Sequence, residues 1–161
     1  MVATMHARIL CIGNRFFAPD TAGPMVFDLL NTRPLPVDVE LVDGGLGGLN
    51  LLPYLEQTEL VVFVDAVVGF RKTPGIVVIN PLESPLSDSR YDHDAGLAYL
   101  LQTAPHVLEG GLPELILVGI EGSPSPDHCR QASNICLTLV TTAQHPNLCG
   151  LPAGHGGDCD G

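Results

Sequence analysis

The stretch that decides the fold is ILCIGNRFFAPDTAGPMVFDLL, from Ile9 to Leu30. It begins as an apolar strand, turns at Gly13-Asn14, passes through a short loop to Asp20 and continues as an amphipathic helix. This order of strand, loop and helix places the Asp20 carboxylate beyond the carboxyl end of the first strand. Open α/β sheets build their binding sites at this edge. Asp20 is therefore the first candidate site residue.

Outward from this stretch, strand-like and helix-like patterns alternate along the whole chain. Apolar or alternating runs predict strands at residues 8–12, 38–42, 60–64, 76–79 and 114–120, and helical spacing predicts helices at 22–30, 49–55, 95–101 and 127–144. These elements predict an α/β fold. Its expected form is a three-layer sandwich, with a twisted, mostly parallel sheet of about five strands and helices on both faces. One antiparallel strand is expected, because the connection between 60–64 and 76–79 is short enough for a hairpin.

The charge and hydropathy of the chain argue against two classes of partner. Seven basic and eighteen acidic side chains leave a formal charge of −11, and the sequence shows no basic patch that would attract a nucleic-acid backbone. No apolar run approaches the roughly 20 residues that span a bilayer. The amino terminus also lacks the apolar core and cleavage site of a signal peptide. We therefore expect a cytoplasmic protein with no nucleic-acid binding and no membrane insertion.

The composition divides the chain into a domain and a tail. Residues 1–144 are expected to form a single α/β domain, since this length suits one core. Residues 145–161 are rich in Gly, Pro, Cys and His without apolar periodicity, and we expect a flexible extension. A small metal clamp is the alternative, because the tail holds four possible ligands: Cys149, His155, Asp158 and Cys159. Their spacing fits no standard zinc module.

Two further candidate residues occupy places comparable to that of Asp20. Asp65 directly follows the buried run 60–64, so its carboxylate must either reach solvent in a cleft or be paired. His93 lies between two aspartates just before the predicted helix at 95–101. Structural alternatives remain open: Asp20 could cap the following helix, Asp65 could accept backbone donors from the next loop, and His93 could be solvated or capping.

Together these three side chains suggest metal chemistry. Two carboxylates and one imidazole suit a borderline divalent metal such as nickel or zinc, with positions left for water or substrate. The sequence contains no HExxH, paired CxxC, P-loop or GxSxG motif, and the Gly44–Gly48 loop lacks GxGxxG spacing. Cys11 and Cys136 lie in apolar runs, where a free thiol commonly packs as a small hydrophobe. We expect Asp20, Asp65 and His93 to form one metal site, and no side chain identifies itself as a nucleophile.

The surroundings of these residues also carry a family resemblance. The segments are Gly13-Asn14 with Asp20, Gly23 and Pro24, then LVDGGLGGLNLLPYLE at 41–56, VVFVDAV at 61–67 and HDAGL at 93–97. In spacing and context they resemble the [NiFe]-hydrogenase maturation endopeptidase family. The resemblance covers roughly residues 8 to 120.

This resemblance implies a phosphorylase/hydrolase-like sheet with helices on both faces, a protease-like domain at residues 1–144 and a specific activity. Such an enzyme removes a short carboxyl-terminal peptide from the hydrogenase large-subunit precursor once nickel is installed. Asp20, Asp65 and His93 match the positions that the family uses to bind metal, and Asp20 and Asp65 are favoured as catalytic residues. The nickel would arrive with the protein substrate, and other divalent cations could substitute for it. The ion could mark readiness, polarise the scissile carbonyl or activate a water.

Departures from the family pattern keep other functions open. The family usually has an acid just before the first ligand and a glycine just after it, whereas this chain has Pro19 and Thr21. The segment GIEGSPSPD at 119–127 is also only loosely similar. The departures at Pro19 and Thr21 favour the alternative of a non-catalytic, metal-sensing chaperone of the immature large subunit. A peptidyl-tRNA hydrolase or nucleoside phosphorylase would rest on fold analogy alone.

Overall fold

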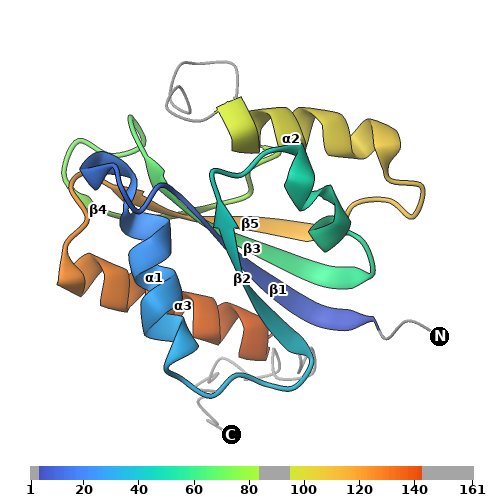
Figure 1. Cartoon of the computed structure of the whole chain (residues 1–161), viewed down its shortest axis with the longest axis horizontal. Helices are drawn as coiled ribbons and strands as arrows, with labels where there is room; N and C mark the ends of the chain where they lie inside the picture. The colour runs from blue at the N-terminus through green and yellow to red at the C-terminus, as the bar shows by residue number, and fades with distance from the viewer. Residues whose placement is uncertain (1–3, 84–94, 143–161) are drawn as a thin grey trace, which may run out of the picture.

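Five strands form one sheet in the structure, a computed structural model that describes residues 4–83 and 95–142 (Figure 1). They are β1 (Met5–Ile12), β2 (Val39–Gly45), β3 (Thr58–Val67), β4 (Gly75–Ile79) and β5 (Glu114–Glu121). Their order in the sheet is β2-β1-β3-β5-β4. Strands β2, β1, β3 and β5 run parallel, and β4 runs antiparallel to β5. The predicted mostly parallel sheet with one antiparallel strand is confirmed.

Helices cover both faces of this sheet, which confirms the three-layer sandwich. Helices α1 (Ala22–Asn31) and α3 (Pro126–Thr142) pack on one face. Helix α2 (Ala95–Val107) and the 3-10 helix η2 (Leu49–Leu55) pack on the other (Figure 1). A second 3-10 helix, η1 (Ala18–Asp20), lies between the end of β1 and the start of α1.

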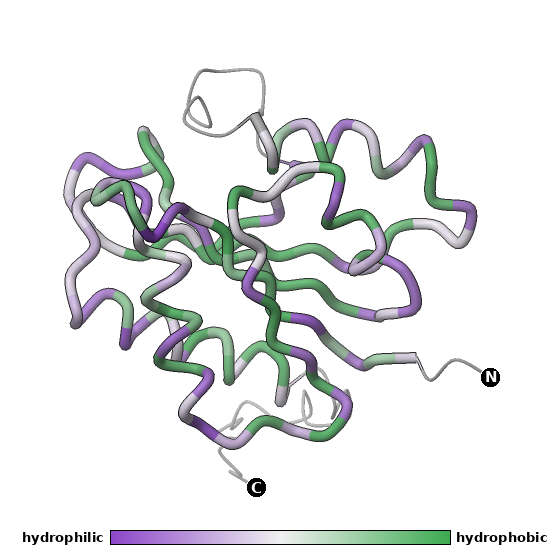
Figure 2. The backbone as a smooth tube through the Cα atoms, in the orientation of Figure 1, coloured by the Kyte–Doolittle hydropathy of each residue, from purple (hydrophilic) through white to green (hydrophobic). Residues whose placement is uncertain are grey.

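The central strands are apolar without interruption because both of their faces are buried. In β3, Leu60, Val62 and Val64 pack toward α1 and α3. The intervening Val61 and Phe63 pack toward η2 and α2. Figure 2 shows the result as green along the middle of the central strands. This alternation also decides which face each polar residue near a strand end occupies.

The prediction that β3 and β4 pair as a hairpin is wrong. Strand β4 pairs with β5, from Gly75 opposite Glu121 to Ile79 opposite Leu117, while β5 takes the place beside β3. The physical reason is burial, because β5 is apolar enough to be covered on both faces and β4 is partly exposed. The connection from β3 to β4 therefore crosses the end of β5.

Several element ends differ from the predicted ones. Strand β3 continues to Val67, so Asp65 lies within the strand and does not follow it. Helix α2 runs on to Val107, past the predicted end at Leu101, because Ala104 continues its buried stripe. None of the helices in the described ranges is both long and apolar enough to cross a membrane. The tail at 145–161 lies outside the described residues.

Candidate functional site

The loop after β1 holds Asp20 close to the end of that strand. The backbone N–H of Asn14 donates to the Asp20 carboxylate at 3.0 Å and to the Asp20 carbonyl oxygen at 2.9 Å. The Asp20 N–H in turn donates to the carbonyl of Phe17 at 2.8 Å. Asp20 is only 9% exposed. The loop therefore folds back on itself and presents one buried carboxylate at the carboxyl edge of the sheet.

Two glycines make this close approach possible. A Cβ on Gly13 would lie 2.4 Å from the Asp20 carbonyl oxygen, and a Cβ on Gly23 would lie 1.9 Å from the Ile12 carbonyl oxygen. Both distances are far inside van der Waals contact with backbone atoms, which cannot move aside easily. Glycine at these positions lets the first turn of α1 pack directly on the end of β1.

The capping alternative for Asp20 does not fit the helix start. Helix α1 has Thr21 as its N-cap, and the Thr21 side chain makes no capping hydrogen bond. The Thr21 hydroxyl instead donates back to the Ala18 carbonyl at 3.0 Å. The hydrogen bond from Asn14 draws the Asp20 carboxylate toward the strand that precedes it. Asp20 therefore lies one residue before the N-cap, at the carboxyl edge of the sheet.

An ion-pair cluster fixes the same loop from outside. Arg15 donates to both carboxylate oxygens of Asp28 on α1, at 2.9 Å each, and to Asp43 on β2 at 3.2 Å. The hydrogen bonds from Arg15 hold the pKa of the Asp28 carboxyl below its usual value. These side chains are substantially exposed, so solvent screens the pair. Their role is to connect the loop to α1 and β2.

Asp65 lies on the face of the sheet that α2 covers. It sits between Phe63 and Val67 of β3, both of which pack against η2 and α2, and strand alternation puts its side chain on their face. It pairs across the sheet with Gly119 of β5 and is 5% exposed. Its carboxylate accepts the backbone N–H of Ala66 at 2.8 Å. Asp65 is thus a second buried carboxylate near the carboxyl edge.

The elements that carry the two carboxylates meet, since η1 contacts β3. The third predicted ligand, His93, lies outside the described residues. Within residues 4–83 and 95–142, no three His, Cys, Asp or Glu side chains gather closely enough to hold a metal ion. The shared site of Asp20, Asp65 and His93 therefore stays a prediction. The tail ligands Cys149, His155, Asp158 and Cys159 also fall outside the described ranges.

The glycine-rich loop after β2 receives the start of α2. A Cβ on Gly96 would lie 2.8 Å from the Leu46 carbonyl oxygen and 2.9 Å from the Gly48 nitrogen. Gly45, Gly47 and Gly48 have positive φ angles, as a turn of this kind requires. The loop is therefore a turn whose backbone contacts the first residues of α2, two positions after His93.

Sequence reasoning missed a third buried acid at this edge, Glu121. It ends β5 and is 8% exposed. Its carboxylate accepts backbone N–H groups of Gly69 at 2.8 Å and Phe70 at 2.9 Å, which anchors the connection from β3 to β4. The signal was available, because Glu121 follows an apolar run just as Asp65 does. Its partners indicate a structural role.

The cysteines of the described region are not activated nucleophiles. Cys11, Cys129 and Cys136 are free and buried. Burial raises the pKa of all three thiols, and it raises that of Cys136 to about 12. The thiolate is the reactive form of cysteine, so these residues serve as small hydrophobes. This confirms the interpretation of Cys11 and Cys136 made from their apolar surroundings.

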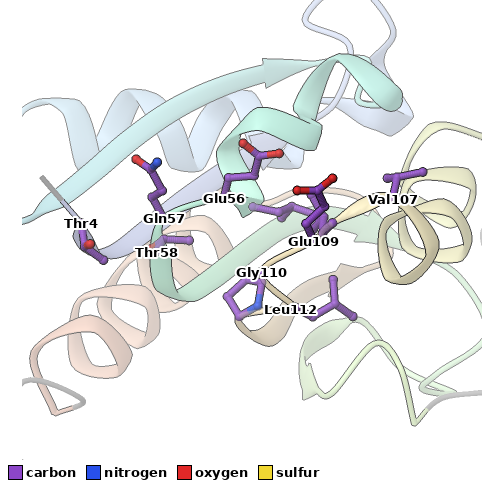
Figure 3. Close-up of a pocket in the computed structure, with 12 residues that line it drawn as sticks. Thr4, Glu56, Gln57, Thr58, Val107, Glu109, Gly110 and Leu112 are labelled. Carbon is purple, nitrogen blue, oxygen red and sulfur yellow. The ribbon is translucent and has the colours of Figure 1, made fainter. Parts of the chain in front are cut away.

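Two cavities lie at opposite edges of the sheet. One, of about 680 Å³, is at the amino-terminal edge, between the turn that precedes β3 and the connection from α2 to β5 (Figure 3). Glu56 and Glu109 are among its lining residues, whereas neither Asp20 nor Asp65 is. The other, of about 630 Å³, is at the carboxyl edge beside η1 and the end of β3. The second cavity adjoins the candidate site.

Comparison with known proteins gives a consistent result. The model of the hydrogenase maturation protease family matches residues 24–134. This range includes Asp65 and His93 and begins just after Asp20. The chain is 42% identical over 71 residues to the hydrogenase expression/formation protein HupD of Rhodobacter capsulatus, covering 44% of this chain and 33% of that protein. It is 29% identical over 121 residues to the hydrogenase 2 maturation protease of Escherichia coli strain K12, covering 72% of this chain and 73% of that protein.

A solved structure extends the comparison to the fold. The hydrogenase maturating endopeptidase HybD from Escherichia coli superimposes with a TM-score of 0.72 at 25% sequence identity. The superposition covers 86% of this chain and 94% of that one. The similarity therefore includes the β1 to α3 order that positions Asp20 and Asp65, whereas the alignment to HupD spans only a third of that relative's length.

Proposed function

Because this chain belongs to the hydrogenase maturation protease family, we propose that it is an endopeptidase acting on a hydrogenase large-subunit precursor. It removes a carboxyl-terminal peptide from the precursor of a [NiFe]-hydrogenase after nickel insertion. The observation that carries this proposal is the pair of buried carboxylates, Asp20 and Asp65, on neighbouring elements of one sheet edge. Buried charges in proteins are paired or coordinate metals, and this edge is where open α/β sheets bind their ligands.

In this proposal nickel belongs to the substrate, and Asp20, Asp65 and His93 contact it there. Carboxylate oxygens and an imidazole nitrogen match the donor preferences of a borderline divalent ion, and other divalent cations are expected to occupy the same donors. Recognition of the ion would restrict cleavage to precursors that have already been loaded. Asp20 and Asp65 are the favoured catalytic residues, because a carboxylate beside the ion can also orient or deprotonate a water.

The loop geometry supports this assignment for Asp20. Its carboxylate is held by a backbone hydrogen bond from Asn14, and its loop is fixed by Gly13, Gly23 and the Arg15 ion pairs. A ligand held in this way needs little reordering when the ion arrives, which lowers the entropic cost of binding. The nucleophile is left unassigned, since none of the described cysteines is activated.

Intact-mass spectrometry of the precursor tests the proposal. The purified protein is incubated with nickel-loaded precursor and, separately, with precursor that has never received nickel. Loss of a carboxyl-terminal peptide from the loaded precursor alone is the expected result. A stable complex with no change in mass would support the alternative function, a metal-sensing chaperone that binds the immature large subunit without cutting it.

A further inference from the structure

The cavity at the carboxyl edge has three walls from separate parts of the chain. The first is η1 with the residue after it, the second is the end of β3, and the third is the turn after β5. Its lining residues from the first and third walls include Ala18, Pro19, Thr21, Ser123 and Pro124. At about 630 Å³ the cavity is large enough to accept a side chain of a bound peptide.

The walls of this cavity are the chain neighbours of both candidate ligands. Pro19 and Thr21 flank Asp20, and Ala66 directly follows Asp65 at the end of β3, with its side chain on the opposite face of that strand. Successive residues of an extended peptide are only about 3.3 Å apart. A substrate strand with its scissile bond at the ion would therefore bring an adjacent side chain to this cavity.

The lining favours an apolar side chain. Ala18, Pro19, Ala66, Val67 and Val68 contribute mainly carbon atoms to the walls. Glu121 is the acid among the lining residues, and its carboxylate already accepts the backbone N–H groups of Gly69 and Phe70. A charged substrate side chain would lose its hydration in this cavity and would find no carboxylate that is not already hydrogen-bonded.

We propose that this cavity is the subsite that selects the substrate, by receiving an apolar side chain next to the scissile bond. The inference rests on the proposed endopeptidase function and adds the recognition element to it. Ala18, Thr21 and Ser123 are then specificity-determining residues. It is consistent with this role that Pro19, Thr21 and residues 121–124 contribute to the walls, because the chain departs from the family pattern at these places.

Filling the cavity from two different walls tests the proposal. Ala18→Trp and Ser123→Trp start from exposed positions, so a large side chain can enter the cavity without disturbing the core. Thr73→Trp is the matched control, because Thr73 is exposed on the nearby connection and does not line the cavity. Thermal unfolding verifies that each variant is folded.

The readout is kcat/KM for nickel-loaded precursors that carry Ala, Leu or Asp on either side of the scissile bond. The wild-type protein and Thr73→Trp are expected to prefer Leu over Ala and Asp by about tenfold or more at one of these positions, the range typical of an apolar pocket. In Ala18→Trp and Ser123→Trp this ratio is expected to fall toward one.

Unchanged selectivity in both folded, filled variants, or a wild-type preference for Asp, would overturn the subsite. A wild-type protein that cleaves none of the nickel-loaded precursors would overturn the proposed function itself, and the subsite with it. The two failures are distinguishable because the first leaves cleavage by the wild-type protein intact.

Discussion

The backbone N–H of Asn14 donates to both the carboxylate and the carbonyl oxygen of Asp20, at 3.0 and 2.9 Å. This bifurcated hydrogen bond joins the end of β1 to the start of α1 across a six-residue interval. It positions a buried carboxylate at the edge where parallel α/β sheets bind their ligands. The candidate site therefore depends on backbone geometry as much as on the acid itself.

Substitution of either carboxylate by its amide should abolish processing while leaving the fold intact. Asp20→Asn and Asp65→Asn keep the side-chain shape and an oxygen that accepts the same backbone N–H, but they remove the charge that favours a cation. We expect kcat/KM for nickel-loaded precursor to fall by at least the roughly 10–100-fold that loss of supporting partners costs at metal sites.

The control for this experiment is Asp127→Asn, at an exposed acid in the first turn of α3. It should process the precursor at the wild-type rate. Thermal unfolding of all three variants should differ little from wild type. If Asp20→Asn and Asp65→Asn cleave as well as wild type does, neither carboxylate is a ligand.

A methyl group at Gly23 should disrupt the junction of β1 and α1. Gly23→Ala puts a Cβ where the Ile12 carbonyl oxygen lies, so the helix must shift away from the strand. Overpacking of this kind typically costs about 1–3 kcal/mol or more. Gly110→Ala is the matched control, because nothing lies within 4 Å of its Cβ. Equal free energies of unfolding for the two variants, measured with denaturant, would show that Gly23 does not lie against the Ile12 carbonyl oxygen.

The sequence predicts the layers of this fold well because buried strands and helices have recognisable patterns of apolar residues. The runs at 60–64 and 115–118 are apolar at every position, and both prove to lie in central strands buried on two faces. The turn at Gly13-Asn14 and the helix from Ala22 follow from local chemistry in the same way. The local sequence pattern is therefore sufficient to predict a strand, turn or helix that depends on its own residues alone.

The pairing of distant strands produces no comparable pattern in the sequence. The antiparallel direction of β4 was predictable, but its partner was not, because the choice between β3 and β5 depends on which strand is better buried. Likewise Asp20 was identified from its loop between a strand and a helix, and Asp65 from its place after an apolar run, whereas Glu121 was passed over. Its backbone partners at Gly69 and Phe70 are separated from it by about fifty residues of chain and become visible only in the fold.

Glu121 should prove to be a stabilising residue. Glu121→Ala would leave the N–H groups of Gly69 and Phe70 without their acceptor, and hydrogen bonds to charged groups contribute about 1.5–3 kcal/mol each. We expect the free energy of unfolding in urea to fall by about 2–4 kcal/mol. Glu121→Gln keeps one acceptor oxygen, so its free energy of unfolding should lie between those of the wild type and Glu121→Ala. The exposed Glu109→Gln should change the stability by less than about 0.5 kcal/mol. A Glu121→Ala variant as stable as wild type would refute the anchoring role.

The buried thiols should resist alkylation in the native protein. Burial raises the pKa of Cys11, Cys129 and Cys136, so their reactive thiolates form only at higher pH than for a free cysteine. Iodoacetamide labelling at pH 8, mapped by peptide mass spectrometry, should leave these three unmodified until urea unfolds the protein. Labelling of Cys11 in the native state as fast as in the unfolded state would contradict the described packing.

Whether Asp20, Asp65 and His93 share one ion is tested most directly by a crystal structure of the protein soaked with nickel. The predicted result is one cation about 2.0–2.2 Å from a carboxylate oxygen of each aspartate and from an imidazole nitrogen of His93. A cation bound elsewhere, with any one of the three side chains on the other face of the sheet, would contradict the shared site.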